Sequence, residues 1–250
     1  MSEEILKKRL SELAERSYNG RIFTFSDFLG LGEQSALESI RREIAHAGIT
    51  LFGGAPGTER VMARFGDEEE LGYSVDFPIS IIEIAPKSQK FSEELSHRDC
   101  LGAIMSLGIE RDTLGDIVIL GKTAYLFAKE AIADYIIENL TKIRHTDVIA
   151  RLADGLPCGE LYKTERITVQ VSSERLDSVI ARAFGLSREE SGELFRRGRV
   201  FVSGRETENL SHSPKPGDTI SVRGCGRFIY LGYKSTSKKG KLNIEIDKFV

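Results

Sequence analysis

Apolar residues recur at two different spacings along this chain, and the alternation between them predicts a mixed α+β protein. From Ile5 to Tyr18 they recur every three or four residues, which indicates an amphipathic helix that ends at Asn19-Gly20. Residues 33 to 47 repeat that spacing, and Gly48 closes this second helix. Residues 77 to 85 form a short, almost continuous apolar run, which is typical of a buried strand.

The first 72 residues are predicted to form a small α/β region. An aromatic cluster follows the first helix and is interpreted as core, and Ile49 to Phe52 is expected to be a strand. The glycine-rich segment from Gly53 to Arg60 invites comparison with a phosphate-binding loop, but it lacks the Gly-Lys-Ser/Thr ending of a Walker loop. We interpret it as a tight structural turn, with an anion site as the alternative, and expect Val61, Met62 and Phe65 on a helix after it.

The central region, residues 73–155, shows the element order β-α-β-β-α-β. A helix is predicted from His97 to Leu107, a hairpin turns at Gly121-Lys122, and a long helix runs from Lys129 to Lys142. This order predicts a ferredoxin-like or RRM-like sandwich, which is also the layout of RNA-recognition folds. The aromatic signature of the standard RNA-recognition motif is missing, so base stacking is not expected on its strands.

Residues 164–250 are predicted to form a third domain around two short helices and a strand. Leu176, Val179 and Ile180 line one helical face, which Gly185 ends. Ser187 is a capping residue for the second helix, with Glu190 as its capping-box partner. This frame brings several guanidinium groups together, and such groups bind phosphate bidentately. The predicted contacts are Arg175, Arg188, Arg196, Arg197, Arg199 and Arg205.

Charge is distributed unevenly, although the whole chain of 250 residues carries a net charge of only −3. From Thr164 to Val250 there are 16 Lys and Arg residues against 11 Asp and Glu, whereas the rest of the chain has 19 against 27. A basic end on an acidic body is expected when one module binds nucleic acid, although a solvated basic face is the alternative. Arg98 and Arg111 of the central region are further candidate phosphate contacts.

Other features exclude several classes of protein. No apolar run reaches the roughly 18 residues of a membrane span, and no signal peptide is evident at the N-terminus. The cysteines Cys100, Cys158 and Cys225 are too few and too widely spaced for a disulfide framework or a zinc site. We therefore expect a cytoplasmic monomer without metal or cofactor and without catalytic residues.

The C-terminal motifs resemble the S4-like RNA-binding domain, named after a small-subunit ribosomal protein. The resemblance rests on Arg175-Leu176-Asp177, on Leu186-Ser187-Arg188, and on the strand and turn from Gly198 to Gly204, with Lys215-Pro216-Gly217-Asp218 at the expected distance. Ser203 stands where that family usually has Asn. The resemblance adds Ser187 and Lys215 to the candidate RNA-binding residues.

Most of the chain is similar to the YlmH family. The similarity rests on Leu51-Phe52-Gly53-Gly54, on the long segment from His97 to Arg111, and on Gly115-Asp116-Ile117, together with the C-terminal motif. A Phe-Leu-Asp-Pro segment expected after the first helix is replaced by Phe28-Leu29-Gly30-Leu31. The resemblance implies RNA binding without catalysis, with structured ribosomal RNA or tRNA on the large ribosomal subunit as target, in translation or in rescue of stalled ribosomes.

Two other functions stay open at this point. An RNA-modifying enzyme of the pseudouridine synthase type is the main rival, because such enzymes often carry the same S4-like module. Here Asp177 is followed by Ser178-Val179-Ile180 rather than by Thr-Ser-Gly, and too few residues remain for a typical synthase domain. A protein-binding adaptor, linked to cell division or to a photosystem, is the third class, because the first two regions are acidic.

Overall fold

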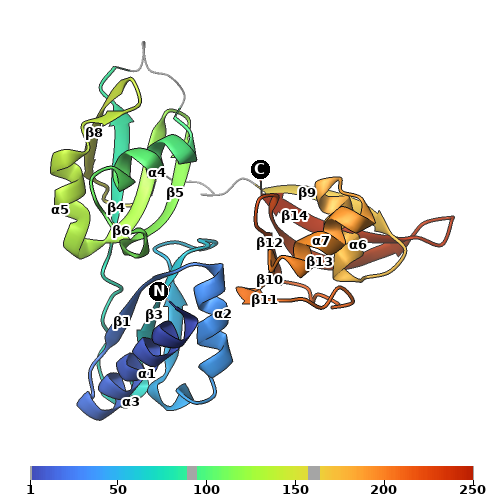
Figure 1. Cartoon of the computed structure of the whole chain (residues 1–250), viewed down its shortest axis with the longest axis horizontal. Coiled ribbons are helices and arrows are strands. Elements are labelled where there is room, and N and C mark those ends of the chain that lie inside the picture. Colours follow the sequence, from blue (N-terminus) through green and yellow to red (C-terminus); the bar gives the residue numbers. More distant parts are fainter. Residues whose placement is uncertain (1, 89–94, 157–163, 250) are drawn as a thin grey trace. The chain divides into compact units, whose positions relative to one another are not determined.

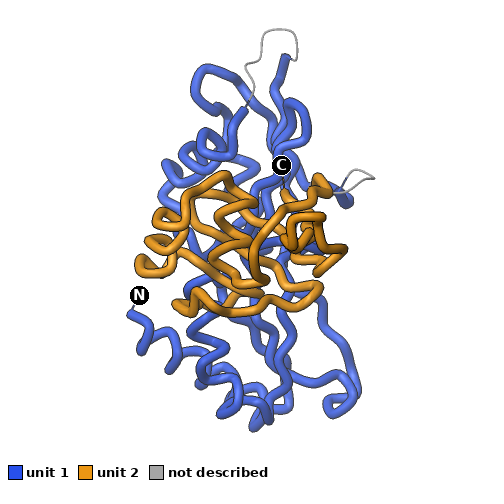
Figure 2. The backbone as a smooth tube through the Cα atoms, turned by 90° about the vertical axis from the view of Figure 1, so that its right-hand side faces the viewer, with its two compact units in different colours: residues 1–161 blue, residues 162–250 orange. Residues whose placement is uncertain are grey.

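The computed structural model describes residues 2–88, 95–156 and 164–249. The chain divides into two compact units, residues 1–161 (unit 1) and residues 162–250 (unit 2), which Figure 2 colours separately. The described strands form three sheets, and every recorded strand pair within them is antiparallel. The chain is therefore a mixed α+β protein, as its apolar pattern predicted. The predicted division of the first part at residues 72 and 73 stays a prediction, and the residues between the two later predicted domains, 156–163, lie mostly outside the described residues.

The first part of unit 1 packs helices on a three-stranded sheet of order β1-β3-β2 (Figure 1). Its core contains Leu10, Leu37 and Phe65, all nearly or fully buried. The elements are α1 (Glu3–Gly20), β1 (Thr24–Leu29), α2 (Leu31–Ile40), the 3-10 turn η1 (Ala45–Ala47), β2 (Ile49–Phe52), β3 (Val61–Phe65) and α3 (Glu68–Leu71).

Two predictions for this part were wrong in detail. Val61–Phe65 is strand β3 and not a helix, because it pairs with β1 on one side and β2 on the other. The helix predicted over residues 33–47 ends at Ile40, and tight turns lead from there to η1. Ile44 and Ala47 are nevertheless buried. The apolar spacing therefore predicted which residues are buried, although it did not predict where the helix ends.

The second part of unit 1 packs helices on a five-stranded sheet of order β5-β6-β4-β8-β7. Alternate residues such as Ile82 and Ile84 face the helices and are fully buried. The elements are β4 (Ile79–Pro86), α4 (His97–Met105), the 3-10 turn η2 (Arg111–Thr113), β5 (Leu114–Leu120), β6 (Thr123–Lys129), α5 (Glu130–Asn139), β7 (Lys142–Ile143) and β8 (Thr146–Leu152). The predicted element order is present, with β7 as an addition.

Unit 2 packs two helices on a six-stranded sheet of order β11-β10-β12-β13-β14-β9. Its core includes Val179, Phe195, Phe228 and Ile244. The elements are β9 (Thr164–Val171), α6 (Leu176–Phe184), α7 (Arg188–Arg196), β10 (Val200–Val202), β11 (Arg205–Glu206), β12 (Thr219–Val222), β13 (Gly226–Thr236) and β14 (Leu242–Phe249). The turn predicted at Ser203-Gly204 has φ of 48° and 81°, the left-handed conformation in which Gly and Asn are favoured.

Candidate nucleic-acid interface

The two helices of unit 2 form a rigid frame because each has defined ends. Gly185 adopts the left-handed conformation that closes α6, with φ of 69°. Ser187 caps α7, since its Oγ accepts a hydrogen bond from the Glu190 amide while the Glu190 carboxylate accepts one from the Ser187 amide. Ser191 Oγ donates to the carbonyl of Asp177 over 2.9 Å and ties α7 to α6. Cations on these helices are thus held in fixed positions.

Arg175 is occupied within the frame. Its Nε and second terminal nitrogen donate to the two carboxylate oxygens of Asp177 over 3.0 and 3.1 Å. Burial of Asp177 opposes its ionisation, but the hydrogen bonds and charge of Arg175 hold the pKa of the carboxyl below its ordinary value. The Arg-Leu-Asp segment therefore acts first as an internal clamp at the start of α6.

Arg196 and Arg197 share one carboxylate at the end of α7. Glu193 lies 2.7 Å from an Arg196 nitrogen and 2.9 Å from Arg197 Nε. These hydrogen bonds lower the pKa of Glu193, so it is ionised at neutral pH. Both arginines are exposed, and a phosphate that binds them competes with Glu193.

A second group of cations is exposed and unpaired. Arg188, Arg199 and Lys215 have side chains that make no ion pair or hydrogen bond with any residue that the structure describes. Arg205, which is exposed on β11, does not belong to this unpaired group. Of the candidates in unit 2, the unpaired group is the most readily available to phosphate, because no internal partner must be displaced.

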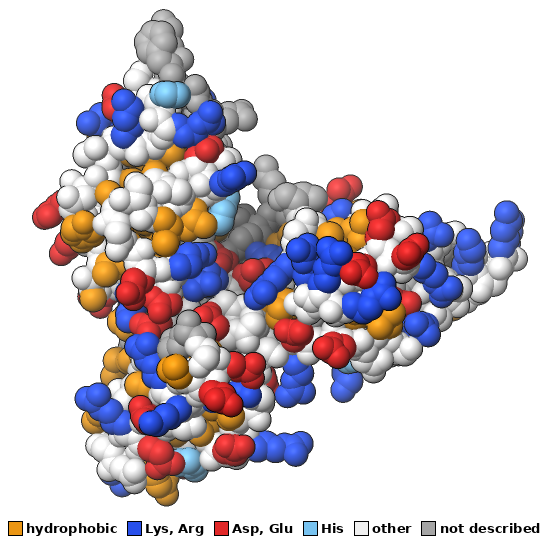
Figure 3. Space-filling view, viewed as in Figure 1, with side chains coloured by type: hydrophobic (Ala, Val, Ile, Leu, Met, Phe, Trp, Pro, Cys, Tyr) orange, Lys and Arg blue, Asp and Glu red, His pale blue; other side chains and the backbone are white. Residues whose placement is uncertain are grey.

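Sequence reasoning missed two further cations, Arg182 and Lys241. Both are exposed, and neither side chain has an ion-pair partner among the described residues. Arg182 lies in the last turn of α6, and Lys241 directly precedes β14. Toward the β13–β14 hairpin, the charged side chains in view on unit 2 are Lys and Arg (Figure 3). The sequence contained a signal for Arg182. It lies six residues before Arg188, and the Gly185 turn between them makes the end of α6 adjacent to the start of α7.

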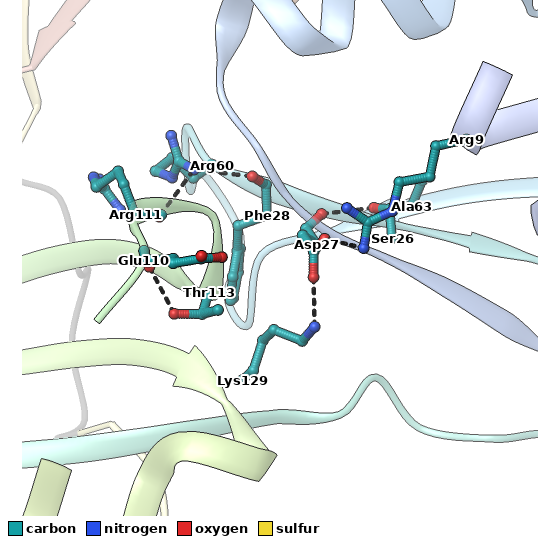
Figure 4. A network of polar contacts seen from close by, with 10 residues as sticks. All are labelled: Arg9, Ser26, Asp27, Phe28, Arg60, Ala63, Glu110, Arg111, Thr113 and Lys129. Carbon is teal, nitrogen blue, oxygen red and sulfur yellow. Dashed lines mark hydrogen bonds and ion pairs between the residues drawn. The ribbon is translucent and has the colours of Figure 1, made fainter. Parts of the chain in front are cut away.

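In unit 1 the candidate Arg111 points inward. Its terminal nitrogen donates to the carbonyls of Leu114 and Gly115 over 2.7 and 3.2 Å. Burial and the neighbouring positive charge of Arg60 lower the pKa of Arg111 to about 10, so it stays charged at neutral pH. Arg60 donates to the carbonyls of Phe28, Leu114 and Arg111, which joins the two sheets of unit 1 (Figure 4).

Asp27 forms a second link between the two sheets of unit 1. An irregularity in the β1–β3 pairing lies between Phe25 and Phe28 and includes Asp27. Its carboxylate lies 2.7 Å from an Arg9 nitrogen and 2.5 Å from Lys129 Nζ, and Figure 4 shows it between the two. Lys129 of β6 thus links the second sheet of unit 1 to β1 of the first.

The glycine-rich loop of unit 1 already holds an anion, and it belongs to the chain itself. The amides of Glu59 and Arg60 donate to the carboxylate of Asp116 over 2.6 and 3.1 Å. Gly53 has no room for a Cβ, which would lie 2.2 Å from the Arg60 carbonyl oxygen. This geometry supports the interpretation of the loop as a structural turn.

The same loop explains why the aromatics of β6 are not free for bases. Phe127 is fully buried, and a Cβ on Gly54 would lie 2.3 Å from its ring. Tyr125, which projects on the same face of β6 two residues earlier, is also buried. A base cannot stack on rings that the protein already covers.

Arg98 is the outward candidate of unit 1, at the exposed start of α4. The neighbouring Asp99 caps the helix with Ser96 and lies 3.7 Å from Arg144 on the β7–β8 turn. Burial and the charge of Arg111 lower the pKa of His97, although Asp116 opposes this shift. The His-Arg-Asp segment thus opens a helix instead of forming a catalytic loop.

The described residues contain no helix long and apolar enough to span a membrane. They also contain no group of three or more His, Cys, Asp or Glu side chains that could hold a metal ion. Cys100 is buried, which raises the pKa of its thiol to about 11, and Cys225 is free and partly buried. Cys158 lies outside the described residues.

Comparisons with known proteins give one match over most of the chain and others over parts of it. Residues 73–153 match the family model described as "Putative RNA-binding domain in YlmH". The ribosome-associated protein quality control protein P2 of Bacillus subtilis is 29% identical to this chain over 227 residues, which are 89% of this chain and 86% of that protein.

Two shorter matches cover about a quarter of the chain each. The small ribosomal subunit protein uS4 of Kosmotoga olearia is 36% identical over 62 residues, which are 24% of this chain and 30% of that protein. An uncharacterized RNA pseudouridine synthase of Aquifex aeolicus is 34% identical over 77 residues, which are 27% of this chain and 32% of that protein. Both cover less than a third of the other protein's length.

Proposed function

We propose that this chain, which belongs to the YlmH family, is a non-catalytic protein that binds ribosomal RNA or tRNA at the large ribosomal subunit, in translation or in the rescue of stalled ribosomes. The observation that carries the proposal is the set of exposed, unpaired cations on the capped helix pair of unit 2. The similarity to a ribosome-associated quality control protein over most of both chains supports the ribosome as the place of action.

The predicted RNA contacts are part of this proposal, and the geometry suggests how readily each of them can bind phosphate. Arg188, Arg199 and Lys215 bind phosphate directly because they are unpaired, and Arg196 and Arg197 bind after releasing Glu193. Arg205 and Arg98 add outer contacts, while Arg175, Ser187 and Arg111 position the frame. We further propose a cytoplasmic monomer that needs no cofactor or metal.

The subdivision of the fold is part of the same proposal. The strand order β5-β6-β4-β8 and the helices between these strands support a ferredoxin/RRM-like domain at residues 73–155. The short similarity to uS4 supports an S4-like domain, which we assign to residues 164–250. Residues 1–72 then form the N-terminal α/β region.

The pseudouridine synthase alternative is disfavoured by the state of Asp177. A nucleophilic carboxylate must reach its substrate, whereas the Asp177 side chain is only 7% exposed and is held bidentately by Arg175. The match to a synthase covers only about a third of that protein. Pseudouridine has the same mass as uridine, so carbodiimide labelling of pseudouridines in ribosomal RNA after incubation with the chain tests this. A new labelled position that Asp177→Asn abolishes would refute the non-catalytic proposal.

The binding proposal is tested by the salt dependence of RNA affinity. Each phosphate contact releases counterions, so the slope of log K against log salt is about −0.9 per contact on duplex nucleic acid. Arg188→Ala with Arg199→Ala should lower affinity for a ribosomal RNA fragment roughly tenfold and flatten the slope by about 2 units. Fluorescence anisotropy over a salt series measures both quantities.

A matched control removes two positive charges elsewhere in unit 2. Arg166 is held by Asp247 and Lys234 by Glu245, and both cations are exposed. Arg166→Ala with Lys234→Ala should leave the salt slope nearly unchanged. If both double variants change the slope equally, RNA senses only the net charge of unit 2, and the assignment of specific contacts is wrong.

A further inference from the structure

A pocket of about 500 Å³ lies in unit 2, beside the point where β9 ends. Its walls come from the end of β9, the last turn of α6, the turn before α7 and the residue that precedes β14. Because Leu242 pairs with Val171, the preceding Lys241 lies beside Ser172. The volume falls in the range of roughly 300–1,000 Å³ that small-molecule sites occupy.

Three cations line this pocket without a negative charge in its wall. Arg182, Arg188 and Lys241 all contribute to it, and the residues that line it include no Asp or Glu. None of the three side chains makes an ion pair or hydrogen bond with a residue of the described ranges 2–88, 95–156 and 164–249. The nearby Asp177 carboxylate interacts with the charge of Arg188, but Arg175 already holds it bidentately. Like charges in one pocket repel each other, so an anion there would stabilise the arrangement.

The rest of the wall suits a planar ring with polar edges. Val171, Ala181 and Leu186 supply apolar surface, and Gln170 and Ser172 supply hydrogen-bonding groups. At the N-terminus of α7, the Ser187 and Glu190 amides are already occupied by the capping side chains. The cationic side chains are therefore the main groups available to hold an anion, next to the apolar residues of the wall.

From this juxtaposition of three cations, apolar residues and polar uncharged groups in one wall, we propose that the pocket binds one unpaired nucleotide of an RNA, with the phosphate on the cations and the base against the apolar residues. This inference rests on the proposed function and specifies the RNA feature that unit 2 recognises. A paired nucleotide cannot enter, because its base is stacked inside the helix. A bulged nucleotide enters at the smallest energetic cost, since it is already unpaired.

The test compares three RNA hairpins that share one stem. One is fully paired, one carries a single bulged nucleotide, and one carries an abasic bulge at the same position. Binding of the full chain is measured by fluorescence anisotropy at one fixed salt concentration. We expect the nucleotide bulge to bind roughly tenfold more tightly than the other two hairpins, because only its base can bury apolar surface against Val171, Ala181 and Leu186.

Two variants locate the effect. Arg182→Ala with Lys241→Ala should abolish the tenfold preference, whereas Arg166→Ala with Lys234→Ala, which removes the same charge outside the pocket, should preserve it. Equal binding of the paired and bulged hairpins would overturn the pocket while leaving the proposed function intact. Equal binding of the abasic and nucleotide bulges would also overturn it, because the base would then contribute nothing. Failure of all three hairpins to bind, by a chain that does bind the ribosomal RNA fragment, would overturn the pocket as well. Failure to bind that fragment too would overturn the proposed function itself.

Discussion

Unit 1 and unit 2 use the same side chain for opposite purposes. In unit 1, Arg60 and Arg111 are partly buried and donate to backbone carbonyls of the chain itself. In unit 2, Arg188 and Arg199 are exposed and have no side-chain partner among the residues that the structure describes. An arginine therefore indicates RNA binding only where its donors are unsatisfied. The acidic balance of unit 1 is consistent with this, because some of its cations are already committed internally.

The largest expected effect is on the folding of unit 1. Arg60→Ala leaves the carbonyl of Phe28 without its charged donor and that of Leu114 with Arg111 as its remaining charged donor, which should cost about 3 kcal/mol of local stability. Hydrogen exchange of the β1 and β3 amides measures this cost without assuming that both units unfold together. Binding of RNA to unit 2 should stay unchanged while the protein is folded.

The matched control for that experiment is Arg98→Ala in the same unit. Arg98 is exposed, so its removal should change the exchange of β1 and β3 by less than about 0.5 kcal/mol. Equal effects of the two substitutions would show that the inward arginine is no more structural than the outward one, and the contrast between the two units would fail.

A smaller effect is expected at Arg196 and Arg197, because these exposed arginines of unit 2 are paired with a carboxylate of the chain itself. Glu193 competes with phosphate for Arg196 and Arg197, so Glu193→Gln should raise RNA affinity roughly threefold at low salt. Anisotropy with a ribosomal RNA fragment measures the change. Glu189→Gln, at an exposed position of the same helix, controls for the loss of one negative charge. If Glu193→Gln instead lowers the RNA affinity, Glu193 orients the two arginines for RNA and does not compete with RNA for them.

The smallest expected effect is a pH dependence in unit 1. Burial and the charge of Arg111 lower the folded-state pKa of His97 below its unfolded value of about 6.5. The unfolded state then binds more protons, so this contribution to stability is present above pH 6.5 and is lost as the pH falls from there toward the folded pKa. An NMR titration of the imidazole should show the lowered pKa, and Arg111→Ala should raise it. A His97 pKa at or above 6.5 in the native protein would contradict the inward placement of Arg111.

Short-range patterns predicted unit 2 well. The apolar spacing of α6, the stop at Gly185 and the capping box of α7 involve residues within a few positions of one another, and all three are present. The pairing of Glu193 with Arg196 and Arg197 was also accessible, because residues three and four apart are neighbours on a helix.

Contacts between segments that are distant in the chain could not be predicted from such short-range patterns. Val61, Met62 and Phe65 fit a helical spacing, and only pairing with β1 and β2 made this segment a strand. The partners of Arg60 come from segments about 30 and 50 residues away, so no local pattern could show that its donors are occupied. The Lys241 side of the pocket likewise depends on the pairing of β14 with β9.

The pairing of β14 with β9 also affects how unit 2 folds. β9 is an edge strand of the sheet, and its eight residues pair with β14, about 70 residues later in the chain. Bringing two such distant segments together costs conformational entropy and is slow. We therefore expect the pairing of β9 with β14 to be a late step in the folding of unit 2. During synthesis, β9, α6 and α7 leave the ribosome before their closing strand exists. A nascent chain that stops before residue 242 would expose β9 and β13 as unpaired edges, which are the surfaces most prone to aggregation.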